Sequence, residues 1–245
     1  RKRKSPTSSL KISLTDDFTK YSMIKTEIKT SCIIPALNEE DNISRVLDVL
    51  EKIKWLDEII VVDDGSADQT ALVVSNYKSR KIRLIQLEKN LGKGGAMAAG
   101  IKAARNDLLV FLDADLIGLN EGHLLELISP VAFSKTADLT LGVFAISKLN
   151  KNAGTKIANR AVPGISGQRA IYKKNLPSLK QLASSRYGVD LLITKSISKN
   201  RIKVVKLDGL SQNIKEQKTD LFSAIRARVK MYYQISKMFR SLHRS

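Results

Sequence analysis

The sequence predicts an α/β fold in which a mostly parallel sheet is flanked by helices on both faces. Short apolar runs alternate with helix-like stretches at intervals of about 25 residues, the rhythm of repeated strand–helix–strand units. A length of 245 residues suits one large domain. The composition, 43% hydrophobic and 27% charged, is ordinary for a globular chain and excludes wholesale disorder.

Four apolar runs are typical of buried strands, at residues 32–34, 59–62, 82–85 and 108–112. The stretches between them predict helices at 39–53, 67–79 and 93–105. In a parallel sheet, ligands bind beyond the carboxyl ends of the strands. The residues that follow each run are therefore the candidates for a functional site.

Acidic side chains gather at two of these strand ends. Asp63 and Asp64 follow the second run, and Asp113 and Asp115 follow the fourth. A helix N-cap explains a single carboxylate, and Asp68 or Asp41 could serve as one, but it does not explain four that converge. Like charges that lie close together are costly unless a cation or the donors of a ligand neutralise them.

Asp113 and Asp115 are two residues apart, so in an extended segment both side chains project to the same side. Hard oxygen ligands select Mg²⁺ or Mn²⁺, and these ions commonly bridge protein carboxylates to a diphosphate. An isolated Asp-x-Asp triplet also occurs by chance and often caps a turn. The triplet alone therefore leaves both interpretations open.

Residues 90–96 form a glycine-rich segment that contains Lys93 and precedes a predicted helix. Backbone N–H groups at a helix N-terminus favour anions, so a phosphate group suits this place. The segment is neither a Walker A loop nor a G-x-G-x-x-G fingerprint. A plain strand-to-helix turn is the alternative.

Taken together and in this order, four segments resemble the family 2 glycosyltransferases of GT-A fold. More narrowly, they resemble the branch that contains the dolichol- and polyprenyl-phosphate sugar synthases. The segments are Ile34-Pro35-Ala36-Leu37-Asn38-Glu39-Glu40, Val62-Asp63-Asp64-Gly65-Ser66, Asn90-Leu91-Gly92-Lys93-Gly94 and Asp113-Ala114-Asp115. The resemblance covers residues 30–145 and extends, with fewer matching positions, to about residue 215.

The resemblance implies a nucleotide-sugar site and a role for each residue in it. Asp64 would contact the base, Lys93 would lie near the nucleotide and Asp113 would face the ribose or sugar. Asp115, together with Asp113, would hold Mg²⁺ or Mn²⁺ on the diphosphate. The residues expected to bind the donor are Pro35, Ala36, Glu39, Asp64, Lys93, Asp113 and Ala114.

The second half of the chain resembles the acceptor side of the same family. The matching residues there are Ser166, Gly167, Gln168 and Arg169. Arg169 could bind a phosphate through two parallel hydrogen bonds, or it could be solvated beside a turn. Asp190, in the segment 187–190, resembles an acceptor-facing carboxylate that can act as a general base. A phosphate acceptor is already anionic, so Asp190 could instead orient groups or cap a helix at 190–198.

Charge is concentrated at the two ends of a chain whose net charge is +18. Residues 1–30 contain eight Lys or Arg against three Asp or Glu, and residues 211–245 contain eight against two. Basic ends suggest attachment to an anionic membrane surface, with solubilising tails and nucleic-acid contact as alternatives. We expect a basic tail at 1–29, a catalytic domain at 30–218 and a basic amphipathic helix at 219–245, which would lie in the membrane interface or close the domain.

Other features narrow the class of protein. Cys32 is the single cysteine and the histidines are His123 and His243, so a disulfide framework or a Cys/His metal site is not expected. No run reaches the 18 to 20 or so apolar residues of a membrane span and residues 1–30 lack a signal-peptide core, so we expect a cytoplasmic protein, peripheral on the membrane.

The leading hypothesis is metal-dependent transfer of a sugar from a UDP- or GDP-linked donor to an anionic acceptor, foremost polyprenyl phosphate. A small acid such as phosphoglycerate is an alternative acceptor, and a nucleotidyltransferase is an alternative enzyme. Nucleotidyltransferases usually carry an Arg-containing glycine-rich loop after the first strand, where this chain has 35–39. A basic membrane- or nucleic-acid-binding module is the non-enzyme alternative, but an aromatic content of 5% offers few stacking platforms and we expect no nucleic-acid partner. The oligomeric state is left open.

Overall fold

A computed structural model describes residues 28–144 and 166–213 of the chain. Seven strands form one sheet in the order β3-β2-β1-β4-β7-β6-β8. Four of them run parallel to one another: β1 (Thr30–Ala36), β2 (Glu58–Asp63), β3 (Ile82–Gln86) and β4 (Leu108–Phe111). The expected mostly parallel sheet is therefore confirmed.

The remaining three strands of the sheet, beyond β4, include one antiparallel strand. β7 (Arg169–Tyr172) runs antiparallel to both of its neighbours, β4 and β6 (Leu139–Phe144), and β8 (Ile202–Leu207) pairs parallel with β6 at the edge. A separate two-stranded sheet joins β5 (Leu116–Ile117) to β9 (Ser211–Gln212). This small sheet brings residues near 212 next to the end of β4.

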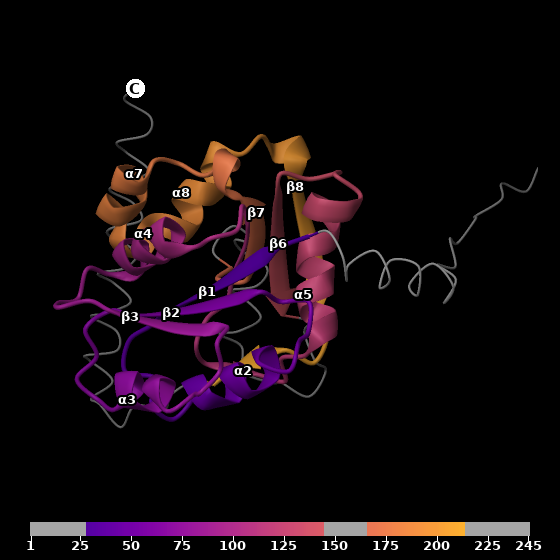
Figure 1. Ribbon diagram of the computed structural model, residues 1–245. Helices are drawn as coiled ribbons and strands as arrows, with labels where there is room; N and C mark the ends of the chain where they lie inside the picture. The colour runs from indigo at the N-terminus through magenta and orange to yellow at the C-terminus, as the bar shows by residue number, and fades with distance from the viewer. Residues whose placement is uncertain (1–27, 145–165, 214–245) are drawn as a thin grey trace, which may run out of the picture.

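Helices cover both faces of the large sheet (Figure 1). One face packs against α2 (Ile43–Leu50), α3 (Thr70–Ser75) and α5 (Glu121–Ile128). The other packs against α4 (Lys93–Ala103), α7 (Leu179–Ser184) and α8 (Val189–Ser196). Short helical turns at Ser129–Phe133, Lys173–Asn175, Arg186–Gly188 and Lys199–Arg201 complete the connections.

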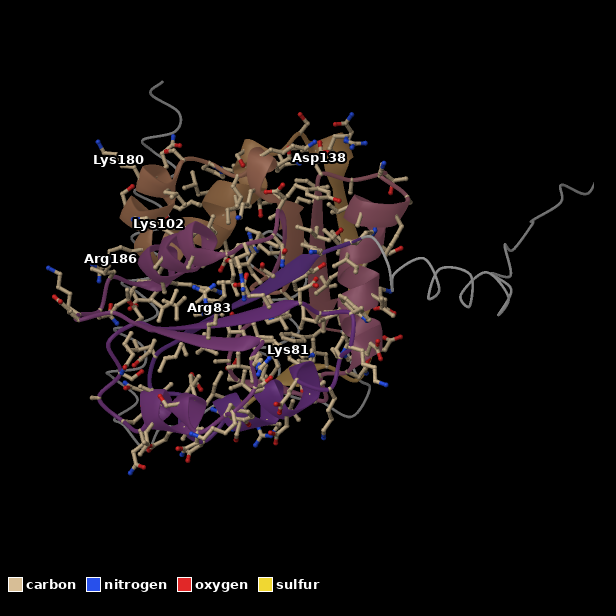
Figure 2. All side chains as sticks on the ribbon, in the orientation of Figure 1. Lys81, Arg83, Lys102, Asp138, Lys180 and Arg186 are labelled. Atoms are coloured by element: carbon tan, nitrogen blue, oxygen red, sulfur yellow. The ribbon has the colours of Figure 1, made fainter. Side chains whose placement is uncertain are left out.

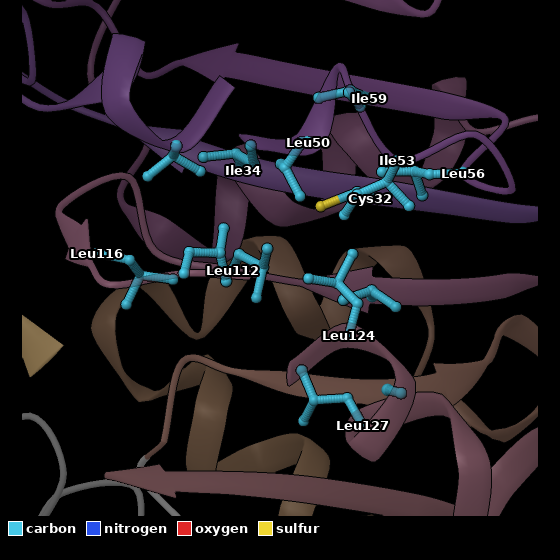
Figure 3. Close-up of a cluster of buried hydrophobic side chains, with 14 of the residues drawn as sticks. Cys32, Ile34, Leu50, Ile53, Leu56, Ile59, Leu112, Leu116, Leu124 and Leu127 are labelled. Atoms are coloured by element: carbon cyan, nitrogen blue, oxygen red, sulfur yellow. The ribbon is translucent and has the colours of Figure 1, made fainter. Parts of the chain in front are cut away.

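Side-chain alternation along the strands divides the core between these two faces. Cys32 and Ile34 of β1 point into the cluster that α2 and α5 cover, which Figure 3 shows, whereas Ile33 points into the cluster beneath α4. A Cβ at Gly100 of α4 would lie 2.5 Å from Ile33 Cγ2, so only glycine allows the helix to approach β1 this closely.

Two predicted helices are shorter than expected. The structure begins α2 at Ile43 and α3 at Thr70, whereas the sequence predicted helices over 39–53 and 67–79. The missing first turns are occupied by two loops that bind each other: the Glu40 N–H donates to Asp68 Oδ2 (3.1 Å), and the Gln69 N–H donates to Glu40 Oε2 (2.7 Å). The two carboxylates thus accept hydrogen bonds from backbone N–H groups that would otherwise belong to the first turn of a longer helix.

Two further predicted segments are not tested. The predicted helix at 219–245 and residues 1–27 of the predicted basic tail lie outside the described residues. Within 28–144 and 166–213, the structure contains no helix that is both long enough and apolar enough to cross a membrane.

Glu58, at the start of β2, is a buried carboxylate that ties three elements together. It accepts hydrogen bonds from Ser31 Oγ (2.6 Å), Arg83 Nη1 (2.5 Å), Arg105 Nε (2.9 Å) and the Arg105 backbone N–H (2.9 Å). Burial alone would raise the pKa of Glu58, but these donors outweigh it and lower the pKa below its usual range. Glu58 therefore stabilises the fold above the ordinary glutamate pKa, and this contribution is lost as the pH falls through the lowered pKa of the folded state.

We expect Glu58→Gln to lower the free energy of unfolding by about 1–2 kcal/mol at pH 7, because charge-assisted hydrogen bonds are lost while both arginines stay partly solvated. Urea denaturation at several pH values measures this. The difference between the variant and the unaltered chain should shrink below pH 4 or so, where the glutamate also becomes neutral.

The matched control is Asp138→Asn. Asp138 pairs with Arg201 at 2.9 Å, but both side chains are more than a third exposed and the pair lies on the β6–β8 side of the sheet (Figure 2). This exposed pair should contribute little. Equal losses in the two variants, or a Glu58→Gln loss that does not change with pH, would contradict the role assigned to Glu58.

Candidate active site

The loops that follow β1 and β2 are fastened together at the carboxyl end of the sheet. The Asp64 N–H donates to the Ala36 carbonyl (2.8 Å), and the Asn38 N–H donates to Ser66 Oγ (2.9 Å). The Ala67 N–H returns a hydrogen bond to Asn38 Oδ1 (2.8 Å). Pro35 is half-buried and Ala36 is buried. The end of β1, which was expected to line the nucleotide, is therefore packed against the loop that contains Asp64.

Asp63 and Asp64 shape backbone turns. Asp63 Oδ1 accepts from the Ser66 N–H at 2.9 Å. Asp64 Oδ1 accepts from the Leu91 N–H at 2.8 Å and the Gly92 N–H contributes as well, so Asp64 holds the glycine-rich turn against β2. Burial raises the pKa of Asp64 even though these donors oppose the rise.

The glycine-rich segment opens α4 as the sequence predicted. Gly92 is the residue before the helix and has a φ of +81°, a conformation that other residues rarely adopt. Lys93, the first helical residue, projects to the strand ends. Its Nζ lies 2.8 Å from Asp113 Oδ1 and 3.1 Å from Asp190 Oδ2.

Lys93 thus joins two carboxylates that the sequence assigned to opposite sides of the reaction. Burial alone would lower the pKa of Lys93, but the attraction of Asp113 and Asp190 outweighs it and raises the pKa, which keeps the ammonium charged. The expected place of Lys93 near the nucleotide remains a prediction. Its contact with Asp190 was not expected.

Asp113 is saturated with donors. Besides Lys93, its Oδ2 accepts from Gln168 Nε2 (2.7 Å) and from Gln212 Nε2 (2.8 Å). Burial would raise the pKa of Asp113, but Lys93 and Gln168 outweigh it and lower the pKa, so the side chain remains ionised.

Asp115 lies beside Asp113, but none of the described Lys or Arg side chains forms an ion pair with it. Burial, together with the negative charges of Asp113 and Glu39, raises the pKa of Asp115 to about 6. Residues 114 and 115 form a turn rather than the extended segment that the sequence predicted, yet Gln212 Nε2 is 2.8 Å from Asp113 and 3.4 Å from Asp115. The two carboxylates therefore still face one common point, with buried Ala114 between them.

These residues fit a divalent cation that a substrate helps to hold. Across 28–144 and 166–213, no three His, Cys, Asp or Glu side chains gather closely enough to bind a metal by themselves. Mg²⁺ typically binds one or two protein carboxylates and completes its shell with phosphate oxygens and water. Such an ion would offset the repulsion from Asp113 and Glu39 that, with burial, raises the pKa of Asp115.

In the segment 166–169, Arg169 neither faces solvent nor has its guanidinium free for a phosphate. Arg169 is fully buried, with an exposed fraction of 0%, so the alternative of a solvated arginine is wrong. Its Nη2 pairs with Asp190 Oδ1 at 2.8 Å and also donates to the Ser166 carbonyl, and its Nη1 donates to the Asp190 carbonyl at 3.0 Å. Ser166 Oγ in turn donates to the Gly142 carbonyl.

Asp190 lies in the first turn of α8 with its carboxylate directed to Lys93 and Arg169. This arrangement fits a side chain that orients charged neighbours better than one that caps its own helix. The residue is only 5% exposed.

Three residues near the site were not identified from the sequence. Gln212 contacts both Asp113 and Asp115, and Asn213 donates from its backbone to the Asp115 carbonyl (2.9 Å). Arg186 has a φ of +48°, lies against Gly92 and interacts electrostatically with Asp64 (Figure 2). Gln212 is 99 residues from Asp113, and no local pattern marks such a distant partner.

A mostly parallel sheet with Asp-x-Asp after its fourth strand and a glycine-rich turn after its third defines a protein of GT-A fold. Solved structures agree with this class. A glucosyl-3-phosphoglycerate synthase from Mycobacterium tuberculosis, solved in complex with Mn²⁺, uridine diphosphate and phosphoglyceric acid, superimposes with a TM-score of 0.70 at 22% identity. The match covers 91% of this chain and 81% of that one, and at this identity it establishes the fold.

The family follows from residues 31–199, which match the model of glycosyl transferase family 2, and the chain belongs to that family. A dolichyl-phosphate beta-glucosyltransferase of Trichomonas vaginalis is 41% identical over 102 residues, 36% of this chain and 30% of the relative. An undecaprenyl-phosphate 4-deoxy-4-formamido-L-arabinose transferase of Proteus mirabilis is 37% identical over 95 residues, 36% of this chain and 29% of the relative. The resemblance to the polyprenyl-phosphate branch is thereby confirmed, although the match spans less than a third of each relative's length.

Gly167 controls how closely the acceptor-side segment approaches Asp113. A Cβ at this position would lie 2.2 Å from Asp113 Oδ2, so Gly167→Ala must displace either the carboxylate or the segment. We expect the variant to lose about 1–3 kcal/mol of unfolding free energy and at least roughly tenfold in transferase activity. Thermal unfolding and a transfer assay measure the two effects.

Gly122→Ala in α5 is the matched control, because a Cβ there would meet only Asn120 Oδ1, at 3.0 Å, and neither Asp113 nor the segment 166–169. This change should leave activity intact. A fully active Gly167→Ala enzyme would show that Asp113 does not need its observed position.

Proposed function

We propose that the chain catalyses metal-dependent transfer of a sugar from a UDP- or GDP-linked donor to an anionic acceptor, with a polyprenyl phosphate as that acceptor. One observation carries the proposal: at the strand ends of a family 2 domain, Asp113 and Asp115 face a common point, and no Lys or Arg within 28–144 and 166–213 forms an ion pair with Asp115. A diphosphate-bound metal ion would supply that charge.

The donor would bind across the loops that follow β1, β2 and β4. Pro35, Ala36 and Glu39 would line the base and ribose, and Asp64 would contact the base. Asp115 and Asp113 would hold Mg²⁺ or Mn²⁺, which stabilises negative charge on the departing diphosphate. The α4 N-terminus offers further partial positive charge to the same phosphates.

In the transfer, the bond from the anomeric carbon to the diphosphate oxygen breaks, and a bond to the acceptor oxygen forms. The bonding electrons leave with the nucleoside diphosphate. A phosphate acceptor attacks with an oxygen that is already negatively charged, so no proton needs to be removed. Asp190, held by Lys93 and Arg169, would then orient groups at the reaction centre; with a hydroxyl acceptor it would take the proton.

The acceptor class is supported by charge and by the names of the relatives. Residues 166–213 contain ten Lys or Arg but only Asp190 and Asp208 as acids, whereas residues 28–144 contain 13 basic and 17 acidic residues. A basic acceptor half suits an anionic acceptor at an anionic surface. We therefore propose peripheral attachment to the cytoplasmic face of a membrane, aided by the basic ends of the chain.

Phosphoglycerate is the second candidate acceptor, because the superimposed structure is of a glucosyl-3-phosphoglycerate synthase. It shares the phosphate with the lipid acceptor but offers a hydroxyl as the nucleophile. The nucleotidyltransferase alternative is disfavoured by the family to which the chain belongs.

We expect Asp115→Asn to abolish the metal-dependent part of UDP or GDP binding and to lower transfer by at least about 100-fold, because one of two carboxylate ligands loses its charge. The folded state should be as stable as before or more stable, since repulsion from Asp113 and Glu39 disappears. Calorimetric titration with each nucleotide, with and without Mn²⁺, measures binding.

Asp107→Asn, at an exposed position just before β4, is the control and should bind as the unaltered chain does. Unchanged turnover in Asp115→Asn would refute the metal role of Asp115.

Acceptor choice is tested at a fixed donor concentration with three compounds: a short-chain polyprenyl phosphate, the corresponding alcohol and 3-phosphoglycerate. We expect the lipid phosphate to be preferred over both by at least about tenfold in kcat/KM, because it combines an anionic nucleophile with an apolar chain. Preference for 3-phosphoglycerate would instead support the second candidate, and preference for the alcohol would require Asp190 as general base.

A further inference from the structure

We propose that Arg169 is a positioning residue that acts through Asp190 and does not bind substrate itself. The inference rests on the proposed function and names how one segment, Gly167–Gln168–Arg169, fixes the two central carboxylates. Gln168 holds Asp113 and Arg169 holds Asp190, so adjacent residues of one backbone segment set the donor-side and acceptor-side acids.

Burial excludes the direct role. Arg169 is the largest fully buried side chain of the described residues, with an exposed fraction of 0%, and its guanidinium already serves the Asp190 carboxylate, the Asp190 carbonyl and the Ser166 carbonyl. A phosphate that approached from solvent would have to displace these partners. The planar fork of arginine suits this double hold on Asp190, which a lysine cannot reproduce.

The backbone places Arg169 on an interior strand, at the edge of the sheet where β4 ends. Arg169 begins β7, where it is paired with Phe111 of β4 on one side and Leu141 of β6 on the other. Asp113 follows β4 by two residues, and Gly167 precedes Arg169 by two. A Cβ at Gly167 would collide with Asp113, so the backbone at Gly167 lies directly against that carboxylate. The pairing of Arg169 with Phe111 fixes the other end of the segment next to β4.

A continuous series of alternating charges results. Asp113 pairs with Lys93 at 2.8 Å, Lys93 with Asp190 at 3.1 Å, and Asp190 with Arg169 at 2.8 Å. Each Asp190 oxygen thus has its own cation, Oδ1 facing Arg169 and Oδ2 facing Lys93. Loss of the Arg169 contact would free the carboxylate to rotate away from Lys93.

Stability gives little reason for a buried arginine here. Arg169 Nε has no hydrogen-bond partner among the described residues, which is a cost, and buried ion pairs are often no more stabilising than apolar side chains of similar size. A costly group whose contacts lead to the two central carboxylates fits a role in holding their geometry.

The test compares Arg169→Lys with the unaltered enzyme in steady-state kinetics and in donor binding. We expect kcat to fall about 10- to 100-fold, while the acceptor KM and the UDP–Mn²⁺ dissociation constant change less than about threefold. A rise in acceptor KM at unchanged kcat would overturn the proposal, because it would mean that Arg169 binds the acceptor phosphate directly.

A double-mutant cycle with Asp190→Asn tests whether Arg169 acts through Asp190. Once Asp190 is neutral, Arg169→Lys should cost little more, so the two losses should be far from multiplicative. Independent, multiplicative losses would contradict the proposal. Arg201→Lys, which alters an exposed Arg–Asp pair remote from the site, is the matched control and should keep full activity.

A crystal structure of the Arg169→Lys variant gives a readout that does not depend on activity. We expect the Asp190 carboxylate to turn away from Lys93, and an unmoved Asp190 would overturn the inference whether or not the protein transfers a sugar. If the unaltered chain shows no transfer while Asp190 moves in the variant, only the proposed function is refuted. Arg169→Met, similar in length but uncharged, is the second variant. If neither variant folds, Arg169 serves folding alone and the proposal is wrong.

Discussion

The ammonium of Lys93, buried between Asp113 and Asp190, is the interaction on which the rest of the site depends. Asp113 comes from the end of β4 and Asp190 from the start of α8, much later in the chain. Without this ammonium, Asp113 would lose its paired cation and Asp190 would keep only Arg169, which burial makes costly. Lys93 is the first residue of α4, so the glycine-rich turn that starts this helix also fixes the charge that joins the two parts of the site.

Asp64 shows how the same constraint reaches the outer loops. Its carboxylate holds the turn at residues 91 and 92 and thereby sets where α4 begins. The helix can lie close to the sheet because Gly100 leaves room for Ile33. It can also lie close to α7 because Gly94 has no Cβ, which would come within 2.3 Å of the Leu182 carbonyl. Small residues and one carboxylate thus place Lys93 to within a hydrogen-bond distance of its two partners.

The sequence predicted the features that depend on neighbouring residues. Apolar runs located β1 to β4, and the acidic residues after β2 and β4 lie at one edge because parallel strands end there. Only Asp113 and Asp115 lie together as expected, since Asp63 and Asp64 instead accept from backbone N–H groups of nearby turns. Long-range contacts were not predictable in this way. Gln212 reaches Asp113 only through the pairing of β5 with β9, and an arginine gives no local sign that it will be buried at a strand start rather than solvated. The shorter α2 and α3 were also not predictable, since their first turns are replaced by hydrogen bonds between two loops that are distant in sequence.

The distribution of charge over the two halves follows from the chemistry that each half would serve. Residues 28–144 carry more acids than bases, as expected for a half whose ligand arrives with a divalent cation. Residues 166–213 carry ten basic residues against two acids, which suits a ligand that arrives as an anion alone. Under the proposed function, two anionic substrates would have to come within bonding distance at the boundary between the halves. Alternating acidic and basic side chains there would keep either half from repelling its own substrate. The order Asp113, Lys93, Asp190, Arg169 meets this requirement with four residues.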